Sequence, residues 1–153
     1  MRTMTGRGGV LAVLALALAA GCAKEPPAPT TVTLEITAAE DMNGGAPTRL
    51  SVYYLNAESL FAKEDFFALT DAPGATLGND LVERDQYLLS PGDTITDTKS
   101  FDAAVPIIGA VAAFRNVDQP GWRTLGQLEP RAANAVQVTL SGSTVTLEKA
   151  ALE

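Results

Sequence analysis

The chain contains no histidine and a single cysteine, Cys22, among its 153 residues. Without histidine, Ser–His and Cys–His nucleophile pairs are excluded, and so are zinc and iron sites with histidine ligands. A lone cysteine also excludes a disulfide within the chain and a redox-active cysteine pair. The chemistry that remains is carboxylate catalysis, Ca²⁺ binding or no catalysis at all.

Positive charge is scarce, because 11 Lys and Arg stand against 18 Asp and Glu and give a formal net charge of −7. An acidic chain is repelled by phosphate groups. This argues against binding to nucleic acid and against electrostatic attachment to anionic lipid.

The chain has one long apolar run, Val10–Ala20, and it follows an N-terminal segment that carries Arg2 and Arg7. A membrane-spanning helix needs about 20 apolar residues, so this run is too short for a stable span. A basic flank, a short apolar run and small residues after it are typical of a signal peptide. We expect residues 1–21 to be removed, which would change the net charge from −7 to −9.

The sequence Leu18-Ala19-Ala20-Gly21-Cys22 resembles the lipobox of bacterial lipoproteins, although Ala19 stands where the lipobox usually has leucine. The alternative is an ordinary secretory signal followed by a chance cysteine. The resemblance implies cleavage before Cys22 and a diacylglycerol on its thiol, and several acyl chains make release from a membrane negligible. Because Ala23 rather than Asp follows the cysteine, the resemblance also implies the outer membrane.

We expect residues 22–30 to form a lipidated tether and residues 31–153 to form one domain. The segment Ala23–Thr30 holds three prolines and no large apolar side chain. Such a segment is extended at about 3.1 Å per residue and would hold the domain roughly 20–25 Å from the membrane.

Alternation of apolar and polar residues predicts strands over Thr31–Thr37 and Arg49–Asn56, separated by the long loop Ala38–Thr48. The same pattern predicts a C-terminal hairpin of Ala135–Leu140 and Thr144–Glu148. The run Pro106–Arg115 has no polar residue before Arg115, which favours a strand buried on both faces. Its small residues, which would let another layer approach closely, are Gly109, Ala110, Ala112 and Ala113.

In the middle of the chain the spacing of the apolar residues changes and no longer alternates as in a strand. We expect a helical excursion with aromatic plugs over Ala57–Thr70, and a proline- and glycine-containing loop over Asp71–Asn79. Seven or eight short strands with one helical interruption predict an all-β, two-sheet sandwich. The remaining predicted pieces are an apolar turn at Leu81-Val82, a strand over Gln86–Leu89, a type II turn at Ser90–Asp93 and an exposed strand over Thr94–Thr98.

Five short motifs follow one another along the chain: Asp65-Phe66-Phe67, Leu77-Gly78-Asn79-Asp80-Leu81, Leu89-Ser90-Pro91-Gly92, Ile108-Gly109-Ala110-Val111-Ala112-Ala113-Phe114-Arg115 and Trp122-Arg123. No single motif is specific, but the set in this order resembles the TssJ lipoproteins of type VI secretion systems. The resemblance runs from Val32 to Leu147.

This resemblance implies a transthyretin-like sandwich with a short helical insertion, lipid-anchored on the periplasmic face of the outer membrane. It implies a non-catalytic protein without cofactor or small-molecule substrate that binds the periplasmic C-terminal domain of TssM. The family contacts TssM through the loop that joins the first two strands. The matching positions here are Ala39, Glu40, Asp41, Met42, Asn43 and Gly44.

Within that loop we expect Met42 to be an exposed apolar anchor surrounded by polar residues, as in the centre of an interface. We also expect the loop to stay outside the core and to be dispensable for folding. Two alternatives for Asp41–Gly44 remain: a solvated connection, or a Ca²⁺ loop whose ligand spacing fails at Gly45.

Several other residues allow both a purely structural and a functional interpretation. Glu83 and Asp85, or Glu64 and Asp65, could form a glycosidase-type pair, although Glu64-Asp65 is more typical of a helix start. Arg115 is expected to end a strand and pair with a carboxylate. The aromatic residues expected in the core rather than in a ligand site are Phe61, Phe66, Phe67 and Trp122.

Besides the TssJ-like adaptor, two functions from other classes stay open. One is a lipoprotein that binds carbohydrate or another small ligand on a similar sandwich, and the other is a carboxylate-dependent hydrolase. An aromatic cluster on an exposed groove would favour ligand binding, and an acidic loop end would favour the adaptor.

Overall fold

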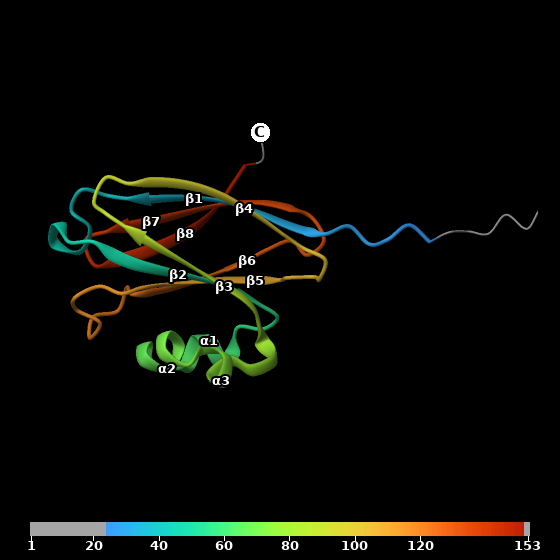
Figure 1. Cartoon of the computed structure of the whole chain (residues 1–153), viewed down its shortest axis with the longest axis horizontal. Helices are drawn as coiled ribbons and strands as arrows, with labels where there is room; N and C mark the ends of the chain where they lie inside the picture. Colours follow the sequence, from blue (N-terminus) through green and yellow to red (C-terminus); the bar gives the residue numbers. More distant parts are fainter. Residues whose placement is uncertain (1–23, 152–153) are drawn as a thin grey trace, which may run out of the picture.

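The computed structural model describes residues 24–151, which form two packed four-stranded sheets with a group of short helices outside one of them (Figure 1). Sheet A has the order β4-β1-β7-β8, and sheet B has the order β3-β2-β5-β6. The strands are β1 (Thr30–Ala38), β2 (Thr48–Leu55), β3 (Leu81–Leu89), β4 (Thr94–Phe101), β5 (Ile107–Ala112), β6 (Arg123–Gln127), β7 (Ala133–Ser141) and β8 (Thr144–Ala150).

Strand β1 pairs in parallel with β7 and antiparallel with β4, and the other neighbours are all antiparallel. The predicted two-sheet sandwich is therefore confirmed. The inward side chains of β1 (Val32, Leu34 and Ile36) have no exposed surface, as their alternation predicted. They form the main core with the inward side chains of β2, β5 and β7.

The helical insertion lies between β2 and β3 in the chain and covers part of the outer face of sheet B (Figure 1). It explains why β5 is buried at all six positions: one face packs against sheet A, and the other packs against the insertion. A second, smaller core of Tyr53, Leu55, Phe61, Leu69, Leu77, Ile107 and Val111 fills that contact. The short helices are α1 (Ser59–Lys63), α2 (Phe66–Asp71), α3 (Pro73–Leu77), η1 (Met42–Gly45) and η2 (Gly78–Asp80).

Gly109 of β5 shows how closely the insertion approaches the sheet. A Cβ atom at this position would lie 2.6 Å from Cζ of Phe61 in α1, too close for two carbon atoms. The close approach expected at the small residues of β5 is thus confirmed at Gly109.

Three boundaries differ from the sequence prediction. The segment expected to be a loop, Asp71–Asn79, contains α3, because Pro73 occupies the first helical turn, where a missing N–H costs nothing, and Leu77 packs into the second core. The predicted turn at Leu81-Val82 belongs to β3, where a register shift next to Leu55 accommodates it. Strand β6 (Arg123–Gln127) was not predicted from the sequence.

The chain turns between β3 and β4 as predicted. Gly92 has a φ of +86°, and the Asp93 N–H donates to the Ser90 carbonyl oxygen over 3.1 Å, as a type II turn requires. The carboxylate of Asp93 in turn accepts from the Ser90 N–H at 2.7 Å.

Candidate functional site

Four connections meet at one end of the sandwich, opposite to the end at which the N-terminal segment enters (Figure 1). We call this group the distal loop end. It consists of residues 39–47 between β1 and β2, residues 90–93 between β3 and β4, residues 113–122 between β5 and β6, and residues 142–143 between β7 and β8.

The β1–β2 loop folds back onto the sandwich through Met42. Its side chain has no exposed surface and belongs to the main core, so the expectation of an exposed apolar anchor is wrong. The expectation that the loop contributes nothing to the core fails with it. A tight turn, in which the Met42 N–H donates to the Ala39 carbonyl oxygen over 3.0 Å, directs the side chain inward.

Asn43 holds three connections of the distal loop end together. Its N–H donates to the Gly142 carbonyl oxygen over 2.6 Å, and its Oδ1 accepts from the Arg115 N–H at 2.8 Å. Its Nδ2 donates to the Pro47 carbonyl oxygen over 3.3 Å. Its φ of +52° is left-handed, a conformation that asparagine tolerates better than most residues. Asn43 is buried, and its side chain is used within the molecule.

The exposed residues of this loop are mostly acidic or small. Glu40 and Asp41 are exposed, as are Gly44, Gly45 and Pro47. Asp41 Oδ1 accepts from the Ser141 hydroxyl at 3.1 Å, and the Glu40 carboxylate lies over Gly92, where a Cβ atom would come within 2.8 Å of it. The loop tip is therefore an acidic surface of fixed shape.

The same contacts bear on the Ca²⁺ alternative. Asp41 and Asn43 direct their side-chain oxygens to different partners, Ser141 and the Arg115 backbone, instead of toward one centre. Within residues 24–151 no group of three or more acidic or thiol side chains is arranged to hold a metal ion.

The carboxylates suspected of a glycosidase-type role are held by a lysine. Glu83 and Asp85 of β3 both accept from Lys99 Nζ of β4, the Asp85 contact being 2.8 Å. Hydrogen bonds to Asp85 and Glu83 raise the pKa of Lys99 to about 12. Together with the 2.7 Å bond from the Tyr87 hydroxyl to Asp97, these contacts join the edge strands of the two sheets. They form a polar seam that closes this side of the sandwich.

Glu64 and Asp65 lie in the helical insertion. Asp65 is the N-cap of α2, and its Oδ1 accepts from the Ala68 N–H at 2.8 Å, which confirms the predicted helix start. Arg115, by contrast, lies beyond the end of β5, and no carboxylate of the described residues pairs with it. The Asn43 contact uses its backbone.

The aromatic residues divide between core and surface. Phe61 is fully buried as predicted, and Trp122 is half-buried against both cores. Phe67 was expected in the core, but 63% of its surface is exposed. Adjacent residues of a helix point in different directions, and in α2 it is Phe66 that packs edge-to-face on Trp122, with ring centroids 5.5 Å apart.

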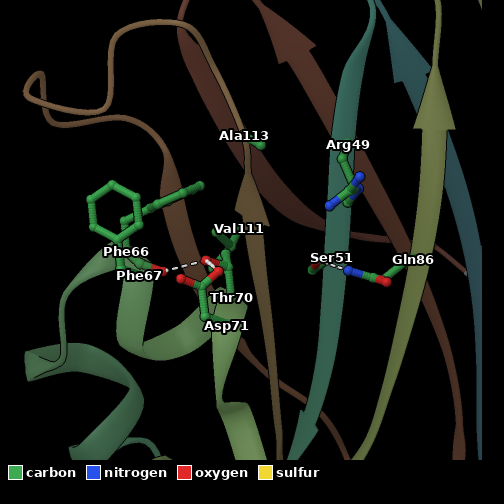
Figure 2. A pocket seen from close by; sticks show the side chains of 9 residues that line it. All are labelled: Arg49, Ser51, Phe66, Phe67, Thr70, Asp71, Gln86, Val111 and Ala113. Carbon is green, nitrogen blue, oxygen red and sulfur yellow. Dashed lines mark hydrogen bonds between the residues drawn. The ribbon is translucent and has the colours of Figure 1, made fainter.

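Next to Phe67, a hollow of about 210 Å³ opens on the outer face of sheet B (Figure 2). Helix α2 forms one wall, and strands β2, β3 and β5 form the floor and the other wall. Figure 2 shows the Arg49 side chain over the strands and the Phe66 and Phe67 rings at the helix side. Sequence reasoning missed this site, because its residues come from segments far apart in the chain. Its main lining residues are Arg49, Ser51, Phe66, Phe67, Gln86 and Ala113.

The chain belongs to the family described as "Type VI secretion lipoprotein, VasD, EvfM, TssJ, VC_A0113", whose model matches residues 30–143. This confirms the resemblance found in the sequence. Among curated proteins, none matches the chain significantly.

Solved structures of this kind share the whole fold. The T6SS lipoprotein TssJ1 from Pseudomonas aeruginosa is 32% identical, with a TM-score of 0.77 over 82% of this chain and 99% of that one. Serratia marcescens Lip, a membrane-bound component of the type VI secretion system, is 26% identical, with a TM-score of 0.71 over 80% and 99%. A chain from a structure described as a type VI membrane complex is 27% identical, with a TM-score of 0.66 over 77% and 97%.

Residues 1–21, predicted as the signal peptide, and Cys22, the predicted lipidation site, lie outside the described residues. Across the part of the chain that the structure describes, no helix is both long enough and apolar enough to cross a membrane.

Proposed function

We propose that this protein is a non-catalytic adaptor of a type VI secretion membrane complex, lipid-anchored through Cys22 on the periplasmic face of the outer membrane. Its partner is the periplasmic C-terminal domain of TssM, which docks on the distal loop end. Membership of the type VI secretion lipoprotein family is the observation that carries this proposal. The similarity to a chain of a type VI membrane complex supports it.

The placement of the two ends fits such a role. The segment that leads back to Cys22 leaves one end of the sandwich, and the distal loop end lies at the other (Figure 1). A lipid anchor on the first end would therefore present the second end to the periplasm. The tether in between has the extended character of a proline-rich segment.

The six positions that match the family's contact loop have different roles in this proposal. Glu40, Asp41 and Gly44 are exposed and contact the partner directly. Ala39, Met42 and Asn43 give the loop its shape from within. The two acids speed the encounter with a basic surface of the partner and make binding sensitive to salt.

The test is a titration of the full mature lipoprotein, purified in detergent, against the periplasmic TssM domain. The double variant Glu40→Lys/Asp41→Lys should bind at least tenfold more weakly, mainly through slower association, and the difference should shrink at high salt. A matched control is Glu35→Lys, an exposed acid on the outer face of sheet A, which should bind like the wild type. If the loop variant also binds like the wild type, the loop is only a connection.

The polar seam bears on the hydrolase alternative. Glu83 and Asp85 lie on an edge strand and share Lys99 as a structural cation, so neither is poised as a free acid or base. The carbohydrate alternative has the exposed aromatic Phe67 in its favour. However, its hollow of about 210 Å³ is smaller than the roughly 300–1,000 Å³ of most ligand sites.

A further inference from the structure

The β1–β2 loop alone lacks the large side chains that usually carry binding energy. A stable interface buries about 800 Å² per partner, and a few large apolar, aromatic or arginine side chains dominate its energy. The exposed residues of the β1–β2 loop are acids, glycines and a proline, and Met42 is in the core. The partner must therefore find its apolar anchors elsewhere.

Within residues 24–151, two large hydrophobic side chains are exposed: Phe67 at 63% and Leu88 at 73%. Both lie on the outer face of sheet B, on either side of Arg49. Leu88 is directly opposite Arg49 in the β2–β3 register, and Arg49 and Phe67 line the same hollow (Figure 2). The three residues thus form one surface, which we call the Phe67 face.

The Phe67 face is continuous with the distal loop end. Arg49 is the second residue of β2 and follows the β1–β2 loop directly, and its carbonyl oxygen accepts from the Ala113 N–H at 2.9 Å, where the β5–β6 connection starts. Leu88 lies two residues before the β3–β4 turn begins at Ser90. A partner that binds the distal loop end can therefore also contact the Phe67 face in one continuous interface.

Phe67 is also held in place before any partner arrives. Its ring packs edge-to-face on Phe66 at 5.4 Å, and Phe66 packs in the same way on Trp122. The Arg123 guanidinium covers Trp122 at 4.6 Å and donates to the Phe61 and Glu64 carbonyl oxygens at 2.9 and 2.7 Å. Burial lowers the pKa of Arg123. An anchor fixed in this way loses little conformational entropy on binding.

We infer that the protein domain that docks on the distal loop end extends onto the Phe67 face, with Phe67 and Leu88 as its apolar anchors. The hollow beside Phe67 receives an apolar side chain of the partner, and Arg49 pairs with a carboxylate of the partner. This inference rests on the proposed function, since it assigns a second part of the same interface. The occupant is a protein surface, because the hollow is small for a ligand and Leu88 adds an exposed apolar side chain next to Arg49, outside the hollow.

Charge patterning supports the assignment. Among the residues that line the hollow, Arg49 is the one basic residue and Asp71 the one acidic residue; Arg49 lies on strand β2 and Asp71 at the end of helix α2. A partner that meets the acidic loop tip with basic residues and Arg49 with an acid would be fixed in one orientation. A wrongly rotated partner would place like charges together.

The experiment measures binding of the full mature lipoprotein in detergent to the immobilised periplasmic TssM domain. The double variant Phe67→Ala/Leu88→Ser should bind at least tenfold more weakly, mainly through faster dissociation, and its melting temperature should fall only slightly because both side chains are mostly exposed. Arg49→Glu should weaken binding by a similar factor. The matched control is Thr98→Ala/Thr146→Ala, on the exposed outer face of sheet A, which should leave binding unchanged.

The outcomes separate this inference from the proposed function. If wild type binds and Glu40→Lys/Asp41→Lys weakens it while the Phe67→Ala/Leu88→Ser variant does not, the inference is overturned and the proposed function stands. If wild type does not bind at all, both are overturned. Sedimentation of the same samples tests a second copy as occupant: self-association that depends on Phe67, with partner binding unaffected, also overturns the inference.

Discussion

The side chain of Asn43 accepts a hydrogen bond from the backbone N–H of Arg115, 72 residues further along the chain, at 2.8 Å. This contact joins the β1–β2 loop to the segment that follows β5. The loop tip that we assign to partner binding is therefore fastened to the sandwich beneath it.

Replacing Asn43 by alanine should destabilise the protein by about 1–3 kcal/mol, because the partly buried hydrogen bonds to the Arg115 N–H and the Pro47 carbonyl oxygen are lost. The left-handed backbone adds to the cost, since alanine tolerates it poorly. In Asn43→Gly the side-chain hydrogen bonds are lost as well, but glycine adopts the left-handed backbone without strain. This variant should therefore be less destabilised than Asn43→Ala. Urea unfolding of the three proteins measures the difference, and equal stability of all three would show that the contact contributes nothing.

Met42→Ala should lower the free energy of unfolding by about 2–5 kcal/mol, as expected for truncation of a fully buried side chain. Glu40→Ala, two residues away and exposed, serves as control and should change it by less than about 0.5 kcal/mol. Denaturant unfolding compares the two. An unchanged denaturation midpoint for Met42→Ala would show that the Met42 side chain is not part of the core.

Gly109→Ala should be destabilising by about 1–3 kcal/mol, because the new methyl group would overlap the Phe61 ring. Gly74→Ala is a matched control, since Gly74 lies in α3 with open space around it and should gain about 0.5–1 kcal/mol from helix propensity. Thermal unfolding of both variants tests the close approach of the insertion to sheet B. Equal shifts for the two would contradict it.

Lys99 of the polar seam and the buried Tyr54 predict loss of stability at alkaline pH. Burial raises the pKa of the Tyr54 hydroxyl above its ordinary value of 10.0, and the neighbouring Tyr87 and Asp85 raise it further. Hydrogen bonds to Asp85 and Glu83 likewise raise the pKa of Lys99 from 10.5 to about 12. Between about pH 10 and 12 the folded protein holds protons that the unfolded chain releases, so stability falls as pH rises through this window.

The variant that tests the alkaline effect is Tyr54→Phe. The Tyr54 hydroxyl has no hydrogen-bond partner among the described residues, so its removal should cost little at neutral pH. It should also make the fall in stability between about pH 10 and 12 less steep. Urea unfolding at a series of pH values gives the slope, and an unchanged slope would show that Tyr54 does not contribute to it.

Cys22→Ser should abolish acyl labelling and leave the protein without a membrane anchor. Labelling with a fatty-acid analogue, followed by fractionation of the envelope, measures both effects. If the variant still fractionates with the outer membrane, the lipobox interpretation fails. A separate Ala23→Asp variant that keeps Cys22 tests the sorting prediction, because it should shift the protein to the inner membrane.

Much of the fold could be predicted from local pattern. The alternation in Thr31–Thr37 and in the C-terminal hairpin identified real strands, and the unbroken apolar run identified β5 as buried on both faces. Each of these signals depends only on which faces of a strand meet water. The helix α3 was missed because proline and glycine indicate a loop more often than a first helical turn.

The candidate site was less predictable, because exposure of a single side chain depends on distant parts of the chain. Met42 lies among polar and glycine residues, and nothing local shows that the loop folds back over the core. Phe66 and Phe67 are chemically identical neighbours, and nothing local shows that Phe66 rather than Phe67 packs against Trp122, which lies 56 residues further along the chain. The Phe67 face combines segments that are far apart in sequence.

The central place of β1 in sheet A has a mechanical consequence. A tether at its N-terminal end transmits any pull between membrane and partner along the axis of this strand. Eight residue pairs with β4 on one side and eight with β7 on the other resist that pull together, since ladder hydrogen bonds lie across the strand. The load is therefore carried in shear by two ladders at once, and no single pair of residues can be peeled away first.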